Sequence, residues 1–308
     1  MVIQKQKNGL FWNIFTGTAL FALLVALSFL PGKRSTAAPL AYLVVLAAIW
    51  IVFVIRSVRQ PEKKQIKDIN YAVFIGFIIW ELVTRIYNIT PEALIPSPEN
   101  VFNVFTIDYE FMLHGLASSM VLLVAGFTLA LVLGNILGLF VGWNDRLRND
   151  FYPIAKVLSP IPPMIYTPYL IAIMPSFTSA SIAVIALGIF WPSFMGMIYR
   201  VGSMDKRIID SAKTLGVSTP TMLLKVILPY SIPSIVSELR IMLSTTFMVL
   251  MLAEMIGAQA GLGFYIKKYS DYADYTRVTA GILFVGVVIT LLNIVISVIE
   301  KKAVKWRA

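Results

Sequence analysis

The sequence predicts an all-α, polytopic membrane protein, and three observations support this prediction. Of its 308 residues, 58% are hydrophobic and only 14% are charged, whereas about one quarter of the residues in a soluble domain are charged. The apolar residues form long uncharged blocks, and a block of about 18 or more residues can cross the hydrocarbon layer as a helix. The basic residues lie mainly between these blocks, as expected for the cytoplasmic segments of a membrane protein.

The uncharged blocks predict about eight transmembrane helices. Residues 10–30 follow Lys5 and Lys7, and this block is longer than the core of a signal peptide, so we interpret it as a retained membrane helix. Residues 157–199 are too long for one crossing, and the segment 175–180 divides them into a fifth and a sixth span. The other predicted spans are residues 37–55, 69–87, 115–143, 234–256 and 278–299.

The distribution of Lys and Arg predicts the orientation in the membrane. If the N-terminus is cytoplasmic, eight crossings place the basic segments 56–67, 146–156 and 200–225 on the inside, together with the basic C-terminus. The outer segment 88–114 contains no Lys or Arg. Both termini and the loop at about 200–230 are therefore predicted to be cytoplasmic.

Composition also predicts the domain organisation. The polar and basic stretch 56–68 is the one strong break in composition along the chain. We therefore predict a transmembrane hairpin at residues 1–60, a basic cytoplasmic linker at 61–68, and a six-helix core at 69–308.

Composition further excludes several classes of function. The net charge of +10 is explained by the cytoplasmic loops, and we expect no nucleic-acid binding because no soluble basic face is available. The chain has no Cys and a single His, His114, so thiolate chemistry is excluded and no metal site is expected. The sequence also lacks a G-x-x-x-x-G-K-[ST] motif, so any ATP must be bound by a partner.

The loop at 200–230 is predicted to form a helix, a glycine turn and a second helix. Residues 204–215 place four apolar side chains at helical spacing on one side, namely Ile208, Ile209, Ala212 and Leu215. Gly216 stands where a helix C-terminus favours glycine, and Thr219-Pro220 resembles an N-cap followed by proline at the first helical position. The apolar face predicts a protein partner; the alternative is a basic amphipathic loop lying on the membrane surface.

The same loop carries a family resemblance. Asp210-Ser211-Ala212, then Gly216, then Leu228-Pro229 resemble the cytoplasmic EAA loop of ABC-importer permeases, E-A-A-x3-G-x9-I-x-L-P. Asp replaces Glu, Ser replaces the first Ala, and Val226 replaces Ile. Four further segments look like the nitrate/sulfonate/taurine importer group: Trp80-Glu81-Leu82, Ile95-Pro96-Ser97-Pro98, Ala253-Glu254-Met255-Ile256 and Gly261-Leu262-Gly263.

The resemblance covers about residues 69–306. It implies the six-helix core of a type I ABC-importer permease, to which the N-terminal hairpin is an addition. It also implies a non-enzymatic subunit in the plasma (inner) membrane of a prokaryote. The implied partners are a second permease copy, two ABC ATPase subunits that bind ATP and Mg, and an extracytoplasmic substrate-binding protein. The implied ATPase-coupling residues are Asp210, Ser211, Ala212, Leu215, Gly216, Leu228 and Pro229.

The resemblance leaves the solute open among nitrate, sulfonates, taurine and other small organic molecules. Met174-Pro175-Ser176 stands where relatives usually carry a glycine. This departure weakens any assignment of the substrate from those relatives. Because the spans contain few polar residues, we expect specificity to lie mainly in the binding protein.

Three residues are candidates for the translocation path or outer gate. Glu254 lies near the outer end of a span, and buried carboxylates in membranes usually face protein or water. The alternative is a structural carboxylate that is capped by backbone or by a basic side chain. Pro163 and Pro168 bend the fifth span, either beside a wet path or in a simple kinked helix.

Two other patterns favour packing rather than transport. Glu81 and Arg85 are four residues apart and favour a local ion pair. Gly134, Gly138 and Gly142 repeat every four residues, which allows a second helix to approach closely, in the core or in a dimer.

The alternative function is an ion-coupled secondary transporter or a channel without an ATPase. Such proteins often place several charged residues in the middle of the membrane. The central spans of this chain are almost bare of them, which counts against this alternative. A membrane scaffold is also disfavoured, because it would not need a helix-glycine-helix docking loop.

Overall fold

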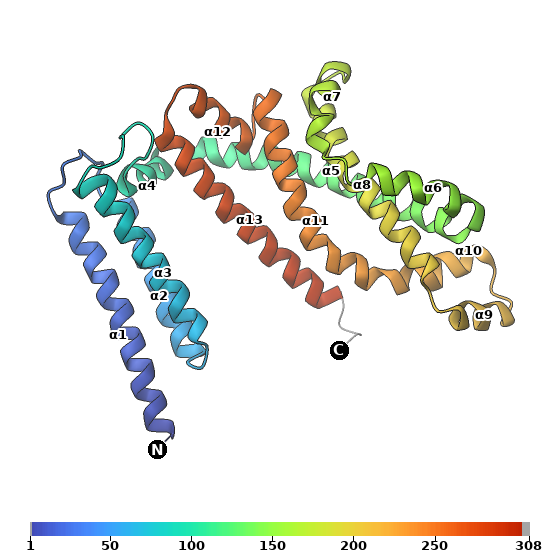
Figure 1. Ribbon diagram of the computed structural model, residues 1–308, viewed down its shortest axis with the longest axis horizontal. Coiled ribbons are helices and arrows are strands. Elements are labelled where there is room, and N and C mark those ends of the chain that lie inside the picture. Colours follow the sequence, from blue (N-terminus) through green and yellow to red (C-terminus); the bar gives the residue numbers. More distant parts are fainter. Residues whose placement is uncertain (1, 304–308) are drawn as a thin grey trace. The chain divides into compact units, whose positions relative to one another are not determined.

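The computed structural model describes residues 2–303, which contain helices and no β-strand (Figure 1). The α-helices are α1 (Val2–Phe29), α2 (Leu40–Arg59), α3 (Lys64–Glu81), α4 (Pro98–Ile107), α5 (Tyr109–Trp143), α6 (Asp145–Leu158), α7 (Thr167–Ile173), α8 (Phe177–Gly202), α9 (Lys206–Thr214), α10 (Thr219–Thr221), α11 (Leu228–Gly257), α12 (Leu262–Asp271) and α13 (Tyr275–Ala303). Single π-helical or 3₁₀ segments, η1 (Leu82–Ile86), η2 (Pro163–Ile165) and η3 (Met222–Ile227), adjoin α3, α7 and α11.

The described helices confirm the predicted membrane class. Seven of them are long and apolar enough to cross a membrane, and the number rises to eight if the bent pair Ile241–Gly257 and Leu262–Asp271 forms one span. The two helices of this pair meet at 46°. The prediction of about eight transmembrane helices is therefore confirmed.

The predicted fifth span is not one continuous helix. Helix α6 ends at Leu158, and the short segments η2 and α7 follow it, so no candidate span falls between Leu158 and Phe177. Proline supplies the physical reason, because it lacks an N–H and pushes the preceding residue towards extended backbone. Pro162, which precedes Pro163, has ψ 127°.

The predicted seventh span begins earlier than expected. Helix α11 starts at Leu228 rather than near residue 234, and Pro229 and Pro233 lie within it. Pro229 occupies the first turn, where an N–H has no partner in the helix. The π-helical segment η3 directly precedes this turn, and such segments accommodate a locally disturbed helical hydrogen-bond ladder.

Packing divides the described chain into two compact units. The first contains the residues up to Phe111 together with Lys268–Ile282, and the second contains Met112–Lys267 together with the residues from Leu283 onwards. In the first unit α1 packs against α2 and α3, and α2 packs against α4. The boundary predicted from composition at residues 61–68 stays a prediction.

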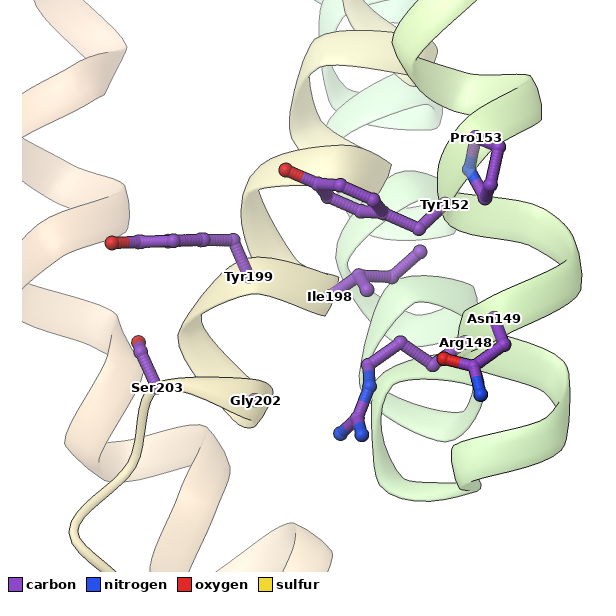
Figure 2. Close-up of a pocket in the computed structure, with 8 residues that line it drawn as sticks. All are labelled: Arg148, Asn149, Tyr152, Pro153, Ile198, Tyr199, Gly202 and Ser203. Atoms are coloured by element: carbon purple, nitrogen blue, oxygen red, sulfur yellow. The ribbon is translucent and has the colours of Figure 1, made fainter.

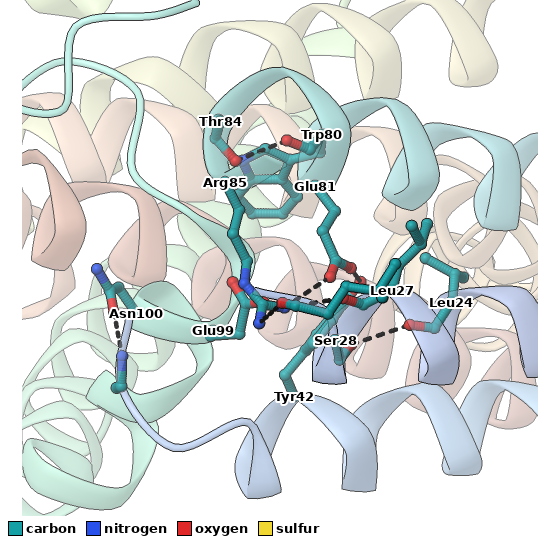
Figure 3. A network of polar contacts seen from close by, with 12 residues as sticks. Leu24, Leu27, Ser28, Tyr42, Trp80, Glu81, Thr84, Arg85, Glu99 and Asn100 are labelled. Carbon is teal, nitrogen blue, oxygen red and sulfur yellow. Dashed lines mark hydrogen bonds and ion pairs between the residues drawn. The ribbon is translucent and has the colours of Figure 1, made fainter. Parts of the chain in front are cut away.

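A buried ionic network fastens the N-terminal hairpin within the first unit (Figure 3). The Arg85 guanidinium lies 3.0 Å from the Glu81 carboxylate, as the local spacing predicts, and 2.8 Å from the carboxylate of Glu99. It also donates to the carbonyl oxygens of Leu27 and Leu30 at the end of α1. Glu81 and Glu99 are 0% and 1% exposed, so this charge cluster is shielded from solvent.

The second unit is built around α5, α8 and α11. Leu123 of α5, Ile185 of α8 and Leu250 of α11 belong to its largest apolar cluster. The glycine repeat of α5 faces α8: a Cβ added at Gly138 would lie 2.7 Å from the Phe194 carbonyl oxygen, and one added at Gly142 would lie 2.9 Å from Val201 Cβ. The repeat therefore serves close helix packing within the chain, which is one of the two uses that the sequence left open.

Candidate functional site

The predicted helix-turn-helix loop is present, and its first helix is capped at both ends. Asp205 precedes α9, and its Oδ1 accepts a hydrogen bond of 2.9 Å from the Arg207 backbone N–H. The Arg207 guanidinium returns to the same carboxylate at 2.7 Å. These side-chain and backbone hydrogen bonds from Arg207 hold the pKa of Asp205 below its ordinary value of 3.8. The N-terminus of α9 therefore keeps an ionised cap.

Gly216 ends α9 with the geometry that favours glycine. Its φ is +72°, in the left-handed region. The Gly216 N–H donates to the Lys213 carbonyl at 2.9 Å, and the Val217 N–H donates to the Ala212 carbonyl at 3.1 Å. These two bonds define a Schellman motif, in which the residue after the C-cap adopts left-handed backbone. The predicted glycine turn is confirmed as local structure.

The second helix of the loop begins one residue earlier than predicted. Ser218 occupies the N-cap position with extended backbone, and Thr219 is the first helical residue. The Ser218 hydroxyl donates to Thr221 Oγ1 at 3.0 Å. Helical structure then continues through η3 into α11, so the loop is joined directly to the long helix that follows it.

The loop rests on the ends of long helices in the second unit. Leu139 of α5, Met197 and Val201 of α8, and Met222 and Ile227 of η3 form one buried cluster, which we call the coupling cluster. Ile209 and Ala212 of α9 pack against it. Half of the predicted apolar face of α9 thus contacts its own chain. The expectation that the whole face needs a protein partner is corrected accordingly.

The other half of that face is open. Leu215 is 82% exposed and Ile208 is 38% exposed. Asp210, Ser211 and Gly216 are also exposed beside them. Leu228 and Pro229 are only half-buried and begin α11 rather than lying on α9. The structure therefore brings together five of the seven predicted coupling residues on α9 and its C-terminal turn, with Leu228 and Pro229 at the root of the loop.

A cavity of about 410 Å³ adjoins the start of this loop (Figure 2). The C-terminal end of α8 forms one wall with Tyr199, Gly202 and Ser203, and α6 forms the other with Arg148 and Tyr152. The Arg148 side chain also reaches the Asp145 carboxylate at 2.6 Å. Sequence reasoning did not identify this cavity, because α6 and α8 contribute to it from positions about 50 residues apart, beyond any helical period.

Glu254 is buried, and both of its oxygens have partners. Its Oε1 accepts a hydrogen bond of 2.6 Å from the Ser119 hydroxyl of α5, and its Oε2 accepts one of 2.8 Å from the Gly263 N–H at the start of α12. Ser119 Oγ in turn accepts from the Leu262 N–H at 3.0 Å. This is the backbone-capped arrangement that the sequence left open as an alternative; a direct role in gating stays a prediction.

The two candidate prolines of the predicted path lie apart from Glu254 in sequence and differ in exposure. Pro163 packs against Gly188 of α8, where an added Cβ would lie 2.6 Å from its ring. It lines a cavity of about 90 Å³ with Thr245 and Thr246 of α11. Pro168 is exposed in the first turn of α7. Glu254 does not line this cavity, so the three candidates do not form one site.

Comparison with known proteins places this fold and loop in a family. Residues 130–305 match the family described as binding-protein-dependent transport system inner membrane component. The taurine transport system permease protein TauC of Escherichia coli (strain K12) is 27% identical over 80% of this chain and 92% of TauC. The putative aliphatic sulfonates transport permease protein SsuC of Bacillus subtilis (strain 168) is 26% identical over 74% of this chain and 83% of SsuC.

Two further similarities agree with this result. The nitrate import permease protein NrtB of Leptolyngbya laminosa is 28% identical over 61% of this chain and 68% of NrtB. An inward-facing structure of the MetNI methionine ABC transporter covers 65% of this chain and 98% of its own chain, with a TM-score of 0.51 and 18% identity. At that identity the structural match supports the fold alone.

The multi-helix membrane fold and the exposed helix-glycine-helix loop therefore agree with a family match that covers more than half of the chain. The chain belongs to the family of binding-protein-dependent transport system inner membrane components. It is a transmembrane permease component of an ABC-type transport system, as the loop pattern predicted.

Proposed function

We propose that this permease couples ATP hydrolysis in a separate ABC ATPase to the import of a small solute. The exposed part of the loop carries the proposal: Leu215 is 82% exposed on a helix whose other side packs on the coupling cluster. An exposed leucine on a helix that is anchored by its other side can bury its apolar surface against a partner. Asp210, Ser211, Ala212, Leu215 and Gly216 form the docking surface, and Leu228 and Pro229 connect it to α11.

The proposed mechanism is alternating access. Two ATPase subunits bind ATP and Mg, and their closure displaces the two loops of a permease homodimer. The coupling cluster joins each loop to α5, α8 and α11, so a displacement of α9 acts on three long helices at once. The permease itself hydrolyses nothing. In this assembly the loop and both termini lie in the cytoplasm, in agreement with the concentration of basic residues there.

The proposed solute is a small molecule that carries an oxyanion, such as a sulfonate, taurine or nitrate. The names of three relatives support this class, since TauC, SsuC and NrtB are named for taurine, aliphatic sulfonates and nitrate. An extracytoplasmic binding protein delivers the solute and supplies most of the specificity. Glu254, Pro163 and Pro168 remain proposed as parts of the path or the outer gate, Glu254 acting through the backbone that it holds.

The test is co-purification in detergent with the ABC ATPase encoded beside this chain, followed by ATP hydrolysis of the complex. Leu215→Asp places a charge on the docking surface and should abolish the stable complex. Thr219→Asp introduces the same charge at an exposed position of the same loop, outside the seven proposed coupling residues, and should leave the complex intact.

Gly216→Trp adds a second probe, because it disturbs the turn without entering the coupling cluster. It should leave the fold largely intact and uncouple transport. If the wild-type chain binds no ATPase, or if Leu215→Asp binds it as tightly as wild type, the docking assignment is wrong. Ion-gradient flux assays would then test the secondary-transporter alternative.

A further inference from the structure

A third cavity lies at the opposite ends of the helices that hold the coupling cluster. Ser118 of α5 and Thr178 of α8 line it, while Leu139 of α5 and Met197 of α8 belong to the coupling cluster. At 1.5 Å per helical residue, Ser118 lies about 32 Å from Leu139 along α5. This is about the thickness of the hydrocarbon core. The cavity and the coupling cluster are therefore separated along α5 by about the thickness of the hydrocarbon core.

This cavity, which we call the outer pocket, has a volume of about 500 Å³. Four of its lining side chains can form hydrogen bonds: His114 and Ser118 at the start of α5, Thr178 at the start of α8, and Gln259 between α11 and α12. Apolar side chains, among them Val121 and Phe177, form the rest of the wall. The volume is in the range of sites that enclose small ligands, which combine apolar walls with a few placed polar groups.

The wall that carries Gln259 is held rigidly. Gly261, two residues further on, has φ +120°, and a Cβ added there would collide with the Glu254 carboxylate. That carboxylate is fixed by Ser119 and Gly263. A Cβ on Gly115 would lie 3.2 Å from the Gly261 carbonyl oxygen, so α5 and the turn also pack closely. The turn that carries Gln259 is thus anchored to α5 and to the end of α11.

The lining offers hydrogen-bond donors for an anion and carries no acidic side chain that would repel one. His114, Ser118, Thr178 and Gln259 each carry at least one N–H or O–H donor, and none of the pocket-lining residues is acidic. Glu254, the carboxylate nearest to Gln259 in sequence, accepts hydrogen bonds from Ser119 and Gly263 through its two oxygens. Several donors lining a partly apolar cavity suit the oxygens of a sulfonate or a nitrate.

We propose that the outer pocket binds the oxyanion group of the solute as it enters the permease, with His114, Ser118, Thr178 and Gln259 as hydrogen-bond donors. This inference rests on the proposed function for the side of the membrane and the class of solute. It assigns to the permease a share of the specificity that the sequence alone placed in the binding protein. Helices α5, α8 and α11 then connect solute contact at one end with the coupling cluster at the other.

The single histidine offers a direct test that does not require the ATPase. The full-length chain, purified in nanodiscs through a tag without histidine, gives ring ¹⁵N signals from a single imidazole after selective ¹⁵N-histidine labelling, and one of these signals is followed. Taurine, methanesulfonate and sodium nitrate should each shift this signal in a saturable way, and choline chloride should not. Thr178→Val removes one donor at nearly constant volume and should weaken the apparent affinity about tenfold.

Thr290→Val is the matched control. Thr290 is exposed on α13, and its hydroxyl bonds only to the Gly286 carbonyl of its own helix; this variant should titrate like wild type. No shift with any of the three anions, an equal shift with choline chloride, or an unchanged titration of Thr178→Val would overturn the proposal.

Native mass spectrometry of the same samples tests a second copy of the chain as the occupant. Loss of the dimer in Thr178→Val together with no anion-dependent shift would assign the pocket to the interface between copies and overturn the solute site. ATPase co-purification reports on the proposed function separately. If the wild-type chain binds the ATPase but shows no histidine shift, the outer-pocket proposal is overturned and the proposed function stands.

Discussion

The Ser119 hydroxyl donates a 2.6 Å hydrogen bond to Glu254 across 135 positions of sequence, and so joins α5 to the end of α11. The same carboxylate accepts from the Gly263 N–H, and its position beneath Gly261 excludes any side chain there. One buried acidic residue therefore fixes two helices and the turn that carries one wall of the outer pocket.

Replacing Glu254 should destabilise this end of the second unit. Glu254→Ala leaves the Ser119 hydroxyl and the Gly263 N–H buried without a partner, at a cost of about 2–4 kcal/mol of unfolding free energy. Glu254→Gln retains one acceptor and nearly the same volume, and should cost about 1 kcal/mol. Thermal unfolding in detergent measures both. Equal stability of Glu254→Ala and wild type would contradict the structural role of the carboxylate.

Substitutions at Gly216 should act through the backbone alone, because no atom lies within 4 Å of a Cβ added there. Gly216→Ala should cost about 1 kcal/mol in the left-handed region, while Gly216→Asn should cost less, since Asn tolerates this conformation. Hydrogen exchange of the α9 amides reports the change. Gly286→Ala is the control: its Cβ also meets nothing, but the residue is helical, so α13 should become slightly more stable. Identical exchange in Gly216→Ala and wild type would refute the strain argument.

Arg85 should be essential to the attachment of the hairpin. Arg85→Met leaves two carboxylates buried without their cation, and breaking a buried ion pair in this way costs about 3–5 kcal/mol. Combining it with Glu81→Gln and Glu99→Gln removes the charges together and should recover most of the loss. Limited proteolysis between α2 and α3 and thermal unfolding compare the single and triple variants. A triple variant as unstable as Arg85→Met would show that charge burial is not the cause.

The N-terminal cap of α9 should depend on pH in a defined direction. The pKa of Asp205 is lowered in the folded chain by hydrogen bonds from Arg207, so its stabilising contribution is present above the unfolded value and is lost as the pH falls through the folded one. Protection of the Arg207 and Ile208 amides, corrected for intrinsic exchange, should therefore be constant at neutral pH and decline below about pH 3.8. Asp205→Asn, which keeps an acceptor without the ionisation, should abolish this decline. A decline centred above pH 5 in the wild type would point to another group.

Local features of the structure follow from the sequence with good accuracy. The turn at Gly216 was predictable because a Schellman motif depends on residues within one helical turn. The Glu81–Arg85 pair was predictable for the same reason, since residues four apart share a helix face. The third member of that cluster, Glu99, was not, because the chain must return through α4 to bring it to Arg85.

The predicted fifth span shows where composition alone misleads. Residues 157–199 contain no charge, so hydropathy predicts two crossings. Backbone hydrogen bonding interrupts the first of these, where Pro160, Pro162, Pro163 and Pro168 withdraw donors within nine residues and break the helix. Apolar composition permits burial in a membrane, but it does not by itself ensure a continuous helix.

The sequence by itself determined the membrane class, the approximate number of spans, the basic loops and the helix-glycine-helix motif, because hydropathy, charge and helix capping are read over short stretches of chain. Only the tertiary structure decided which side of α9 is open, which atoms satisfy Glu254, and that His114, Ser118, Thr178 and Gln259 share one cavity. Those facts depend on helices packing across more than a hundred residues, and no local pattern encodes such distances.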